Sequence, residues 1–393
     1  MYSNFQNDIY AKGMLGGVRP AYPTEFDGWH EAAHQKLTPE AYGYIAGSAG
    51  LETTAHANRA AFARWEIIPR MLRDTSKRDT SVEILGKRWD APIALAPIGV
   101  MTIAHEEGEV AVARGASRRG VPMIASTAAA KPMEEIAAAL HDTSGNETSG
   151  RGWYQLYWSS DRDVALSFVR RAEAAGFEAI VVTVDTWQLA WRPRDLVQAF
   201  LPFLRGEGVA NFLSDPVFQS RLEKSPQEDP EAAIRLWGSI FGNPALTFDD
   251  IAWLREQTSL PILVKGIQHP DDATACIDAG ADGVVVSNHG GRQVDGARAS
   301  LDCLPDIVSA IGGSTILFDS GVRCGADIMK ALALGADAVL IGRPMVYGLA
   351  LGGAEGVEHV LQCLQADFEL NMVLSGIGNV ADIDRTCLVR ADD

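Results

Sequence analysis

The sequence predicts an α/β protein built as a closed (β/α)8 (TIM) barrel. Short apolar runs that suit buried strands recur from residue 91 onward, and helical patterns lie between most of them. The expected strands are Ile93–Ala96, Met123–Ala125, Tyr154–Leu156, Ala179–Val184, Pro261–Val264, Gly283–Val286, Thr315–Phe318 and Ala338–Ile341. Eight strand–helix units over about 270 residues match such a barrel. A doubly wound sheet is the alternative, but it usually has fewer strands and a Gly-x-Gly-x-x-Gly turn after the first, which this sequence lacks.

The segments between the strands support this alternation. The predicted helices include Glu107–Arg119, Arg162–Ala175, Pro270–Ala279 and Gly325–Leu334. Phrases such as Ala279-Gly280-Ala281-Asp282 stand just ahead of strands, and they are typical of helix C-caps that lead into the next strand. A regular order of strand, helix and strand is what a parallel barrel requires.

Two parts of the chain depart from this rhythm. Residues 1–88 read as a helical lead-in, with helices at Pro39–Ala46 and Glu52–Trp65, that packs onto the barrel. Residues 195–246 follow the fourth strand without a clear strand of their own, which indicates a lid over the barrel mouth or a disordered excursion. We expect one domain over residues 1–393, with the barrel at 89–375 and a C-terminal tail at 376–393.

The composition argues against several kinds of function. A net charge of −17 without a basic stripe disfavours a nucleic-acid partner, although a few converging arginines can still bind a small anion. Five widely spaced cysteines without a Cys-x-x-Cys pair fit a reduced cytoplasm and no metal site. The polar start Met1–Tyr10 predicts no signal peptide, and the longest apolar stretch, Ala91–Ala104, is too short to cross a membrane. We expect a cytoplasmic protein without a membrane partner.

Polar residues follow most of the predicted strands, at the end where barrels of this type carry their chemistry. A barrel with a merely polar rim would explain each residue singly, but it rarely gathers a base, an acid, a lysine and several donors in one mouth. The residues at these positions are Pro97, Ile98, Gly99, Ser126, Gln155, Tyr157, Thr183, Asp185, Lys265, Ser287, His289, Arg292, Asp319, Gly321, Arg323, Gly342 and Arg343.

The stretch from Gly283 to Gln293 is the most informative of these strand ends. Its run of valines stops abruptly and is followed by His289 and, three residues later, Arg292. Taken alone, this is slightly better explained as a loop with one solvated charge and one hydrogen-bonded imidazole. Asp185, at the end of the fourth strand, could orient and stabilise His289 as a general base.

Three further groups point to an anionic ligand. Lys265 ends a strand inside the mouth and needs an anionic partner, for which a Schiff base, a substrate carboxylate and a reduced flavin are the candidates. Arg292 could grip a carboxylate together with Arg192, although the spacing allows Arg194 to serve instead. Tyr44 lies between glycines near a predicted helix end, where a core position is the simpler reading.

The last two strands each end in glycine and arginine, in Asp319-Ser320-Gly321-Val322-Arg323 and Gly342-Arg343-Pro344. Free backbone N–H groups and two guanidinium groups at this place in a barrel predict a phosphate site. The pattern does not say which phosphate compound binds.

These residues resemble the FMN-dependent L-2-hydroxy-acid oxidases and dehydrogenases. The resemblance extends from Tyr44-Ile45-Ala46-Gly47 to Phe368-Glu369-Leu370-Asn371-Met372. Its most specific motifs are Thr183-Val184-Asp185-Thr186, Leu263-Val264-Lys265-Gly266 and Ser287-Asn288-His289-Gly290-Gly291-Arg292-Gln293. Within the family, the segments Trp191-Arg192-Pro193-Arg194-Asp195, Phe203-Leu204-Arg205-Gly206 and Asp215-Pro216-Val217-Phe218-Gln219 are most similar to lactate 2-monooxygenases.

The resemblance implies a role for each site residue. His289 would remove the substrate hydroxyl proton while hydride passes to FMN, and Asp185 would stabilise the imidazolium. Tyr157 would bind the substrate oxygen, and Tyr44, Arg192 and Arg292 would hold the carboxylate. The residues implied to hold FMN are Pro97, Ile98, Gly99, Ser126, Gln155, Thr183, Lys265, Ser287, Asp319, Gly321, Arg323, Gly342 and Arg343.

Two positions differ from common family members. Ala128 stands where glycolate oxidase carries tryptophan and lactate 2-monooxygenase leucine, facing the substrate side chain, which suggests room for acids longer than lactate. Gly99 stands where several oxidases carry alanine beside the flavin, and the missing methyl group would leave space near the site of oxygen attack.

The resemblance therefore implies an FMN enzyme that oxidises a small L-2-hydroxy acid with O2, as a homo-oligomer (tetramer or octamer). Lactate 2-monooxygenase activity, giving acetate, CO2 and water, is the first expectation. An oxidase that releases the keto acid and H2O2 is the alternative. A quinone-linked dehydrogenase docked on a membrane is disfavoured by the charges in residues 195–246, and a non-catalytic barrel by the intact His289–Asp185 pair.

Overall fold

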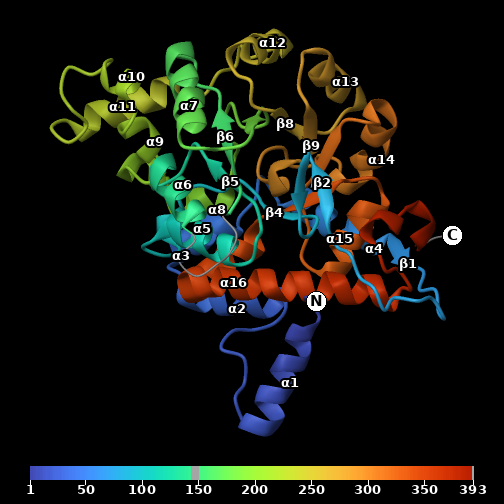
Figure 1. Ribbon diagram of the computed structural model, residues 1–393. Helices are drawn as coiled ribbons and strands as arrows, with labels where there is room; N and C mark the ends of the chain where they lie inside the picture. Colours follow the sequence, from blue (N-terminus) through green and yellow to red (C-terminus); the bar gives the residue numbers. More distant parts are fainter. Residues whose placement is uncertain (143–149, 392–393) are drawn as a thin grey trace.

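Eight parallel strands form a closed barrel in the computed structural model, which describes residues 1–142 and 150–391 (Figure 1). The strands are β4 (Ile93–Leu95), β5 (Met123–Ser126), β6 (Gly152–Tyr157), β7 (Ile180–Thr183), β8 (Ile262–Ile267), β9 (Gly283–Val286), β10 (Thr315–Phe318) and β11 (Ala338–Ile341). Each pairs with its neighbour along the chain, and β11 pairs with β4 to close the ring. The prediction of a (β/α)8 barrel is confirmed.

The helices follow the strands in the order expected for this fold. They are α5 (Gly108–Arg118), α6 (Met133–His141), α7 (Arg162–Ala174), α12 (Phe248–Gln257), α13 (Pro270–Asp278), α14 (Ser300–Ile311), α15 (Gly325–Ala333) and α16 (Arg343–Leu374). Nearly all strand residues are buried, because one face of the sheet meets these helices and the other fills the barrel interior. Ile124, Val181 and Leu263 are among the interior residues.

The N-terminal segment is less helical than predicted. It contains α1 (Asn4–Gly16), α2 (Phe26–Lys36), α3 (Pro39–Ala46) and α4 (Thr53–Ala63), but also β1 (Trp65–Ile67) and a hairpin of β2 (Val82–Ile84) with β3 (Lys87–Trp89). Trp89 of the hairpin packs against Trp153 of β6, with 5.3 Å between ring centroids, in the same cluster as the interior residues. The hairpin thus closes the N-terminal end of the barrel, opposite the predicted site.

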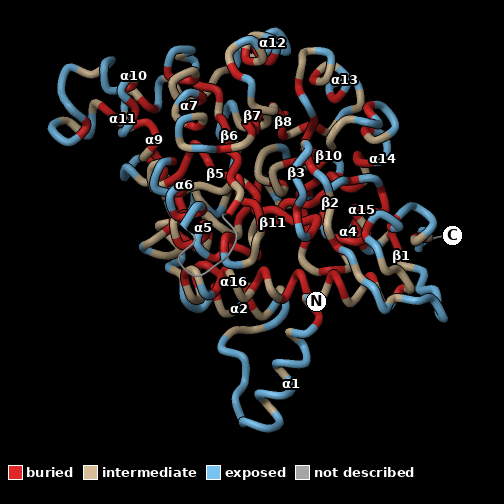
Figure 2. Tube along the Cα trace, in the orientation of Figure 1, coloured by how far each residue is buried: buried red, intermediate tan, exposed pale blue. Residues whose placement is uncertain are grey.

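The two ends of the chain lie on the outside of the barrel. Helix α1 contains no buried residue and projects from the body in Figures 1 and 2. Near the C-terminus, β12 (Leu388–Arg390) pairs antiparallel with β1. Among the described residues, no helix combines the length and the apolar character needed to cross a membrane.

Residues 195–246, which the sequence predicted as a lid and which are called the lid segment below, form short helices and not a disordered excursion. These are the end of α8 (Pro193–Val197), then η2 (Pro202–Arg205), α9 (Ala210–Leu213), α10 (Pro216–Gln219) and α11 (Pro230–Ile240). Asn211 fastens the segment to the end of β5, donating its side-chain N–H groups to the carbonyls of Ser126 (3.2 Å) and Thr127 (3.1 Å). Asp215 is fully buried and pairs with Arg171 of α7 at 3.2 Å.

Candidate active site

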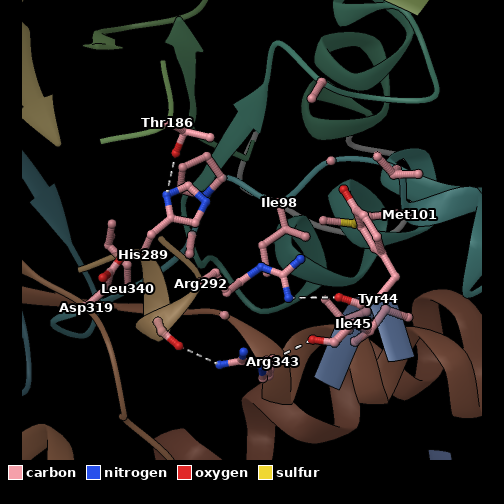
Figure 3. A pocket seen from close by; sticks show the side chains of 18 of the residues that line it. Tyr44, Ile45, Ile98, Met101, Thr186, His289, Arg292, Asp319, Leu340 and Arg343 are labelled. Atoms are coloured by element: carbon pink, nitrogen blue, oxygen red, sulfur yellow. Dashed lines mark hydrogen bonds between the residues drawn. The ribbon is translucent and has the colours of Figure 1, made fainter. Parts of the chain in front are cut away.

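A cavity that is partly open to solvent lies at the C-terminal ends of the barrel strands (Figure 3). The predicted residues on its wall are Tyr44, Pro97, Ile98, Gly99, Ala128, Tyr157, Arg192, Lys265, His289, Arg292, Asp319, Gly321, Arg323, Gly342 and Arg343. The other predicted residues, Ser126, Gln155, Thr183, Asp185 and Ser287, are not part of this wall and lie behind it or at the ends of its strands.

His289 and Asp185 form the pair that the sequence predicted. His289 follows β9 with a positive φ of 57°, and its Nδ1 lies 2.9 Å from Asp185 Oδ1. Thr186 was not predicted; its hydroxyl donates to Asp185 Oδ1 (2.8 Å) and lies 3.1 Å from His289 Nδ1 (Figure 3). With Nδ1 held by the carboxylate, the other ring nitrogen, Nε2, is left as the basic atom of His289.

Opposing effects set the protonation states of this pair. Burial lowers the pKa of His289, and the charge of Asp185 only partly offsets it. Burial acts to raise the pKa of Asp185, but His289 and Lys265 outweigh it and hold that pKa at about 2. At neutral pH the site therefore contains an ionised carboxylate and a neutral imidazole that can accept a proton.

The pH dependence of activity follows from these directions. Because the pKa of His289 is lowered, we expect kcat/KM to stay high as the pH falls through 6.5 and to decrease only below it. Asp185→Asn removes the charge that raises the His289 pKa, so the acid limb should move to still lower pH while the plateau rate falls. Measurement of kcat/KM between about pH 4.5 and 9 for both proteins tests this. An acid limb that moves upward in the variant would contradict it.

Arg192 and Arg292 both line the cavity beside Tyr44. Arg192 is 6% exposed, donating Nε to the carbonyl of Arg292 (3.1 Å) and Nη2 to Gln293 Oε1 (2.8 Å). Arg292 donates to the carbonyls of Tyr44 (2.8 Å) and Gly47 (2.6 Å) and lies 5.3 Å from the Tyr44 ring centroid. Two guanidinium groups held side by side by neutral partners can receive a carboxylate.

Arg194, the other candidate for this role, points elsewhere. It forms an ion pair with Glu52 at 2.7 Å and is not on the cavity wall. The structure therefore favours Arg192 over Arg194.

Tyr157 and Tyr44 line the cavity as protonated phenols. Burial, with the charge of Asp185, raises the pKa of Tyr157 to about 12. Burial also raises the pKa of Tyr44, against the effect of Arg292. Both hydroxyl groups can therefore donate a hydrogen bond to a substrate oxygen at any physiological pH.

Lys265 has an anionic partner that the sequence did not identify. The residue is 3% exposed, and its Nζ lies 3.3 Å from Asp319 Oδ2 and 3.0 Å from Ser287 Oγ. Although burial acts to lower the pKa of Lys265, the charges of Asp319 and Asp185 raise it. A cation therefore stands permanently on this wall, without any need for a Schiff base.

Several buried polar atoms near the cavity have no hydrogen-bond partner among the described residues. They include Gln155 Nε2, Thr183 Oγ1 and Arg323 Nε. The Gln155 side chain is oriented by Ser126, whose hydroxyl donates to its Oε1 at 3.0 Å. Since such atoms are costly to bury unpaired, they indicate a polar ligand that completes the site.

Arg323 and Arg343 form a second cationic part of the wall. Burial and mutual repulsion lower the pKa of Arg323 to about 9, and burial and Arg292 lower that of Arg343 to about 10. Arg343 donates to the carbonyls of Ile45 (3.2 Å) and Gly47 (2.8 Å), partners without charge. Close by, Gly321 has a φ of 98°. Two half-buried guanidinium groups, for which the described residues supply no carboxylate partner, suit a phosphate group.

One expectation about the cavity is wrong. Gly99 leaves no free space for a methyl group, because an added Cβ would lie 2.1 Å from the carbonyl oxygen of Ala128. The glycine lets the loops after β4 and β5 approach each other closely.

Some side chains have roles in the site that the sequence did not indicate. Ser320, with a φ of 84°, accepts hydrogen bonds from the backbone of Asn288 (3.3 Å) and Gly290 (3.0 Å) and so supports the loop that carries His289. Phe203 and Phe241 of the lid segment contribute an aromatic wall, and Phe241 packs against Tyr157 at 5.3 Å between centroids. The motifs had marked Phe203 as lid only, and no local signal marked Phe241.

Comparison with known proteins bears on the ligand. Residues 33–390 match the FMN-dependent dehydrogenase family. The chain belongs to this family. It is 43% identical to an FMN-dependent alpha-hydroxy acid dehydrogenase of Penicillium citrinum, over 99% of the chain and 96% of the relative. It is 42% identical to an L-lactate oxidase of Lysinibacillus sphaericus, over 100% and 99%. A crystal structure of mandelate oxidase with (S)-4-hydroxymandelic acid superposes with a TM-score of 0.82 at 39% identity, covering 93% of this chain and 98% of that one.

The cavity of this FMN-dependent dehydrogenase fits the cofactor. The unpartnered atoms of Gln155 and Thr183 would suit the polar edge of a flavin ring, Lys265 would offset negative charge on it, and Arg323 with Arg343 would suit the phosphate. When bound, FMN supplies the two-electron acceptor for oxidation of a 2-hydroxy acid.

Proposed function

We propose that this enzyme oxidises an L-2-hydroxy acid with an apolar side chain and passes the electrons to O2. The observation that carries the proposal is His289, paired with Asp185 at 2.9 Å, on the wall of the same cavity as Arg192, Arg292 and Tyr44. A proton acceptor and a carboxylate clamp are the two groups that oxidation of a 2-hydroxy acid requires of the protein. The relatives named as oxidases support O2 as the acceptor.

Each residue has a definite task in this proposal. Arg192, Arg292 and the Tyr44 hydroxyl hold the substrate carboxylate. His289 Nε2 accepts the hydroxyl proton, and Asp185 stabilises the imidazolium that results. The Tyr157 hydroxyl donates to the substrate oxygen as it becomes a carbonyl. The protein thus fixes the substrate at one end and removes a proton at the other.

Product analysis tests the proposal. After aerobic turnover of L-lactate by the FMN-loaded enzyme, we expect proton NMR to detect pyruvate or acetate, with O2 consumed in parallel. D-Lactate should give neither product. A protein that binds FMN but consumes no O2 with any L-2-hydroxy acid would contradict the proposal.

The side-chain pocket suits substrates longer than lactate. Ala128 contributes only a methyl group beside the aromatic wall of Phe203 and Phe241. We expect kcat/KM to be higher for 2-hydroxycaproate than for lactate, since each fitted methylene is worth about 1–3 kcal/mol. Ala128→Leu should reduce the rate with 2-hydroxycaproate more than the rate with lactate. A strong preference of the unmodified enzyme for lactate would refute this expectation.

A second candidate, lactate 2-monooxygenase, is favoured by the attachment of the lid segment. Gly208 has a φ of 77°, and an added Cβ there would meet Val100, Phe203 and the carbonyl of Ala128 within 2.9 Å. Asn211 adds its hydrogen bonds to the end of β5. A lid fastened this closely would hold the keto acid until peroxide decarboxylates it, giving acetate, CO2 and water.

Asn211→Ala tests this second candidate. Without the hydrogen bonds to Ser126 and Thr127, the lid segment should open sooner and release the keto acid before decarboxylation. We expect the acetate fraction to fall, and pyruvate and free H2O2 to rise together. Ser239→Ala, an exposed change in the same segment, is the control and should leave the ratio unchanged. If the unmodified enzyme releases only pyruvate and H2O2, it is an oxidase.

A further inference from the structure

A buried carboxyl group next to the cavity has no part in the chemistry described above. Glu109 is the second residue of α5 and is 0% exposed. Its Oε1 accepts the backbone N–H groups of Met101 and Ala130, both at 3.0 Å. Its Oε2 is buried without a partner among residues 1–142 and 150–391. Burying an acidic group costs free energy, so the two hydrogen bonds that Glu109 accepts indicate a role for this side chain.

The two N–H groups belong to different loops of the cavity wall. Met101 lies in the loop after β4, which contributes Pro97 to Val100 to the wall, and Ala130 lies in the loop after β5, which contributes Ala128. The loops also touch directly, because the Val100 N–H donates to the Ala128 carbonyl at 2.9 Å. Glu109 therefore connects the loops after β4 and β5, which meet at Gly99, and it does so without lining the cavity itself.

The backbone at the junction is strained. Val100 has φ 60° and ψ 29°, a left-handed conformation that β-branched residues rarely adopt. Such a conformation persists only where the surroundings fix it, and it is found preferentially at functional sites. The residue after Val100 is Met101, whose N–H is bound by Glu109. The carboxyl group thus secures the strained turn on its C-terminal side.

We propose that Glu109 is a positioning residue for FMN, which sets the part of the cavity wall formed by Pro97, Ile98 and Gly99. The inference rests on the family's cofactor and is independent of the proposed substrate. A purely structural acid would stabilise the fold equally with and without FMN. A positioning residue instead affects the FMN Kd and the environment of the bound flavin.

The test uses the apoprotein titrated with FMN. We expect Glu109→Ala to raise the FMN Kd at least about tenfold, by analogy with the loss of a hydrogen-bond partner that supports the ligand of a bound metal ion. The visible absorption bands of the bound flavin should shift as well. Glu109→Gln keeps an oxygen that can accept both N–H bonds, so its Kd should stay within about threefold of the unmodified protein.

Glu369→Ala is the matched control. Glu369 is also a buried acid, 3% exposed, and its Oε2 accepts a hydrogen bond of 2.7 Å from the backbone N–H of Ser3. It does not line the cavity. This variant should lose thermal stability without a change in FMN Kd or spectrum. If Glu109→Ala fails to fold, Glu109→Asp, too short to bridge both loops, carries the test. Unchanged FMN binding in the Glu109 variant, or equal weakening by Glu369→Ala, would overturn the proposal.

Discussion

Replacement of His289 by glutamine is expected to reduce kcat by about 10²–10⁴-fold, the contribution that a positioned general base commonly makes. Glutamine retains a polar side chain of similar length but cannot accept the hydroxyl proton. Burial lowers the pKa of His289, so the imidazole is neutral at neutral pH, and in the proposed reaction Asp185 would stabilise the charge that it gains. The rate of flavin reduction by L-lactate or 2-hydroxycaproate, measured by stopped flow without O2, reports this step directly.

The His289→Gln variant must be shown to have an otherwise intact site. FMN binding and the substrate Kd should stay close to those of the unmodified enzyme, because the cofactor cradle and the carboxylate clamp are untouched. His269→Gln, at an exposed histidine that caps α13, is the matched control and should be fully active. A His289→Gln enzyme that keeps more than about a tenth of the reduction rate would exclude His289 as the base.

Local pattern sufficed to predict the barrel and the strand ends. A parallel barrel strand is apolar on both faces, so runs such as Gly283–Val286 and Ala338–Ile341 stand out from their polar surroundings, and the structure reproduces both ranges. Once the barrel is predicted, its geometry places the C-terminal ends of all the strands at the same end of the barrel. This is why His289, Lys265 and Arg343 could be assigned to one cavity.

Features that depend on distant contacts could not be predicted in this way. The hairpin of β2 and β3 is stabilised by packing of Trp89 against the barrel interior, and its strands are only three residues long. The ion-pair partner of Lys265 is Asp319, which follows β10, two strands after the strand that contains Lys265. Nor does sequence spacing give side-chain direction. Arg192 precedes helix α8 with an extended backbone, whereas Arg194 lies within that helix and meets Glu52.

Arg192→Met, compared with Arg194→Met, is therefore expected to show which of the two arginines binds the substrate carboxylate. The loss of a charge-assisted hydrogen bond to the substrate carboxylate costs about 1.5–3 kcal/mol, so kcat/KM should fall roughly 10–150-fold, mostly through KM. The fold should tolerate the change, because burial and Arg292 already lower the pKa of Arg192 to about 10.

The matched control is Arg194→Met, which removes the ion pair with Glu52 outside the cavity and should leave KM unchanged. Arg192→Lys restores the charge but not the planar fork of donors, so it should recover only part of the loss. The measurement is steady-state kinetics with one 2-hydroxy acid and its 2-hydroxy amide. The amide lacks the negative charge, so it should be a poor substrate whose rate hardly responds to Arg192→Met. If Arg194→Met raises KM as much as Arg192→Met does, the carboxylate is bound differently from the clamp proposed for this cavity.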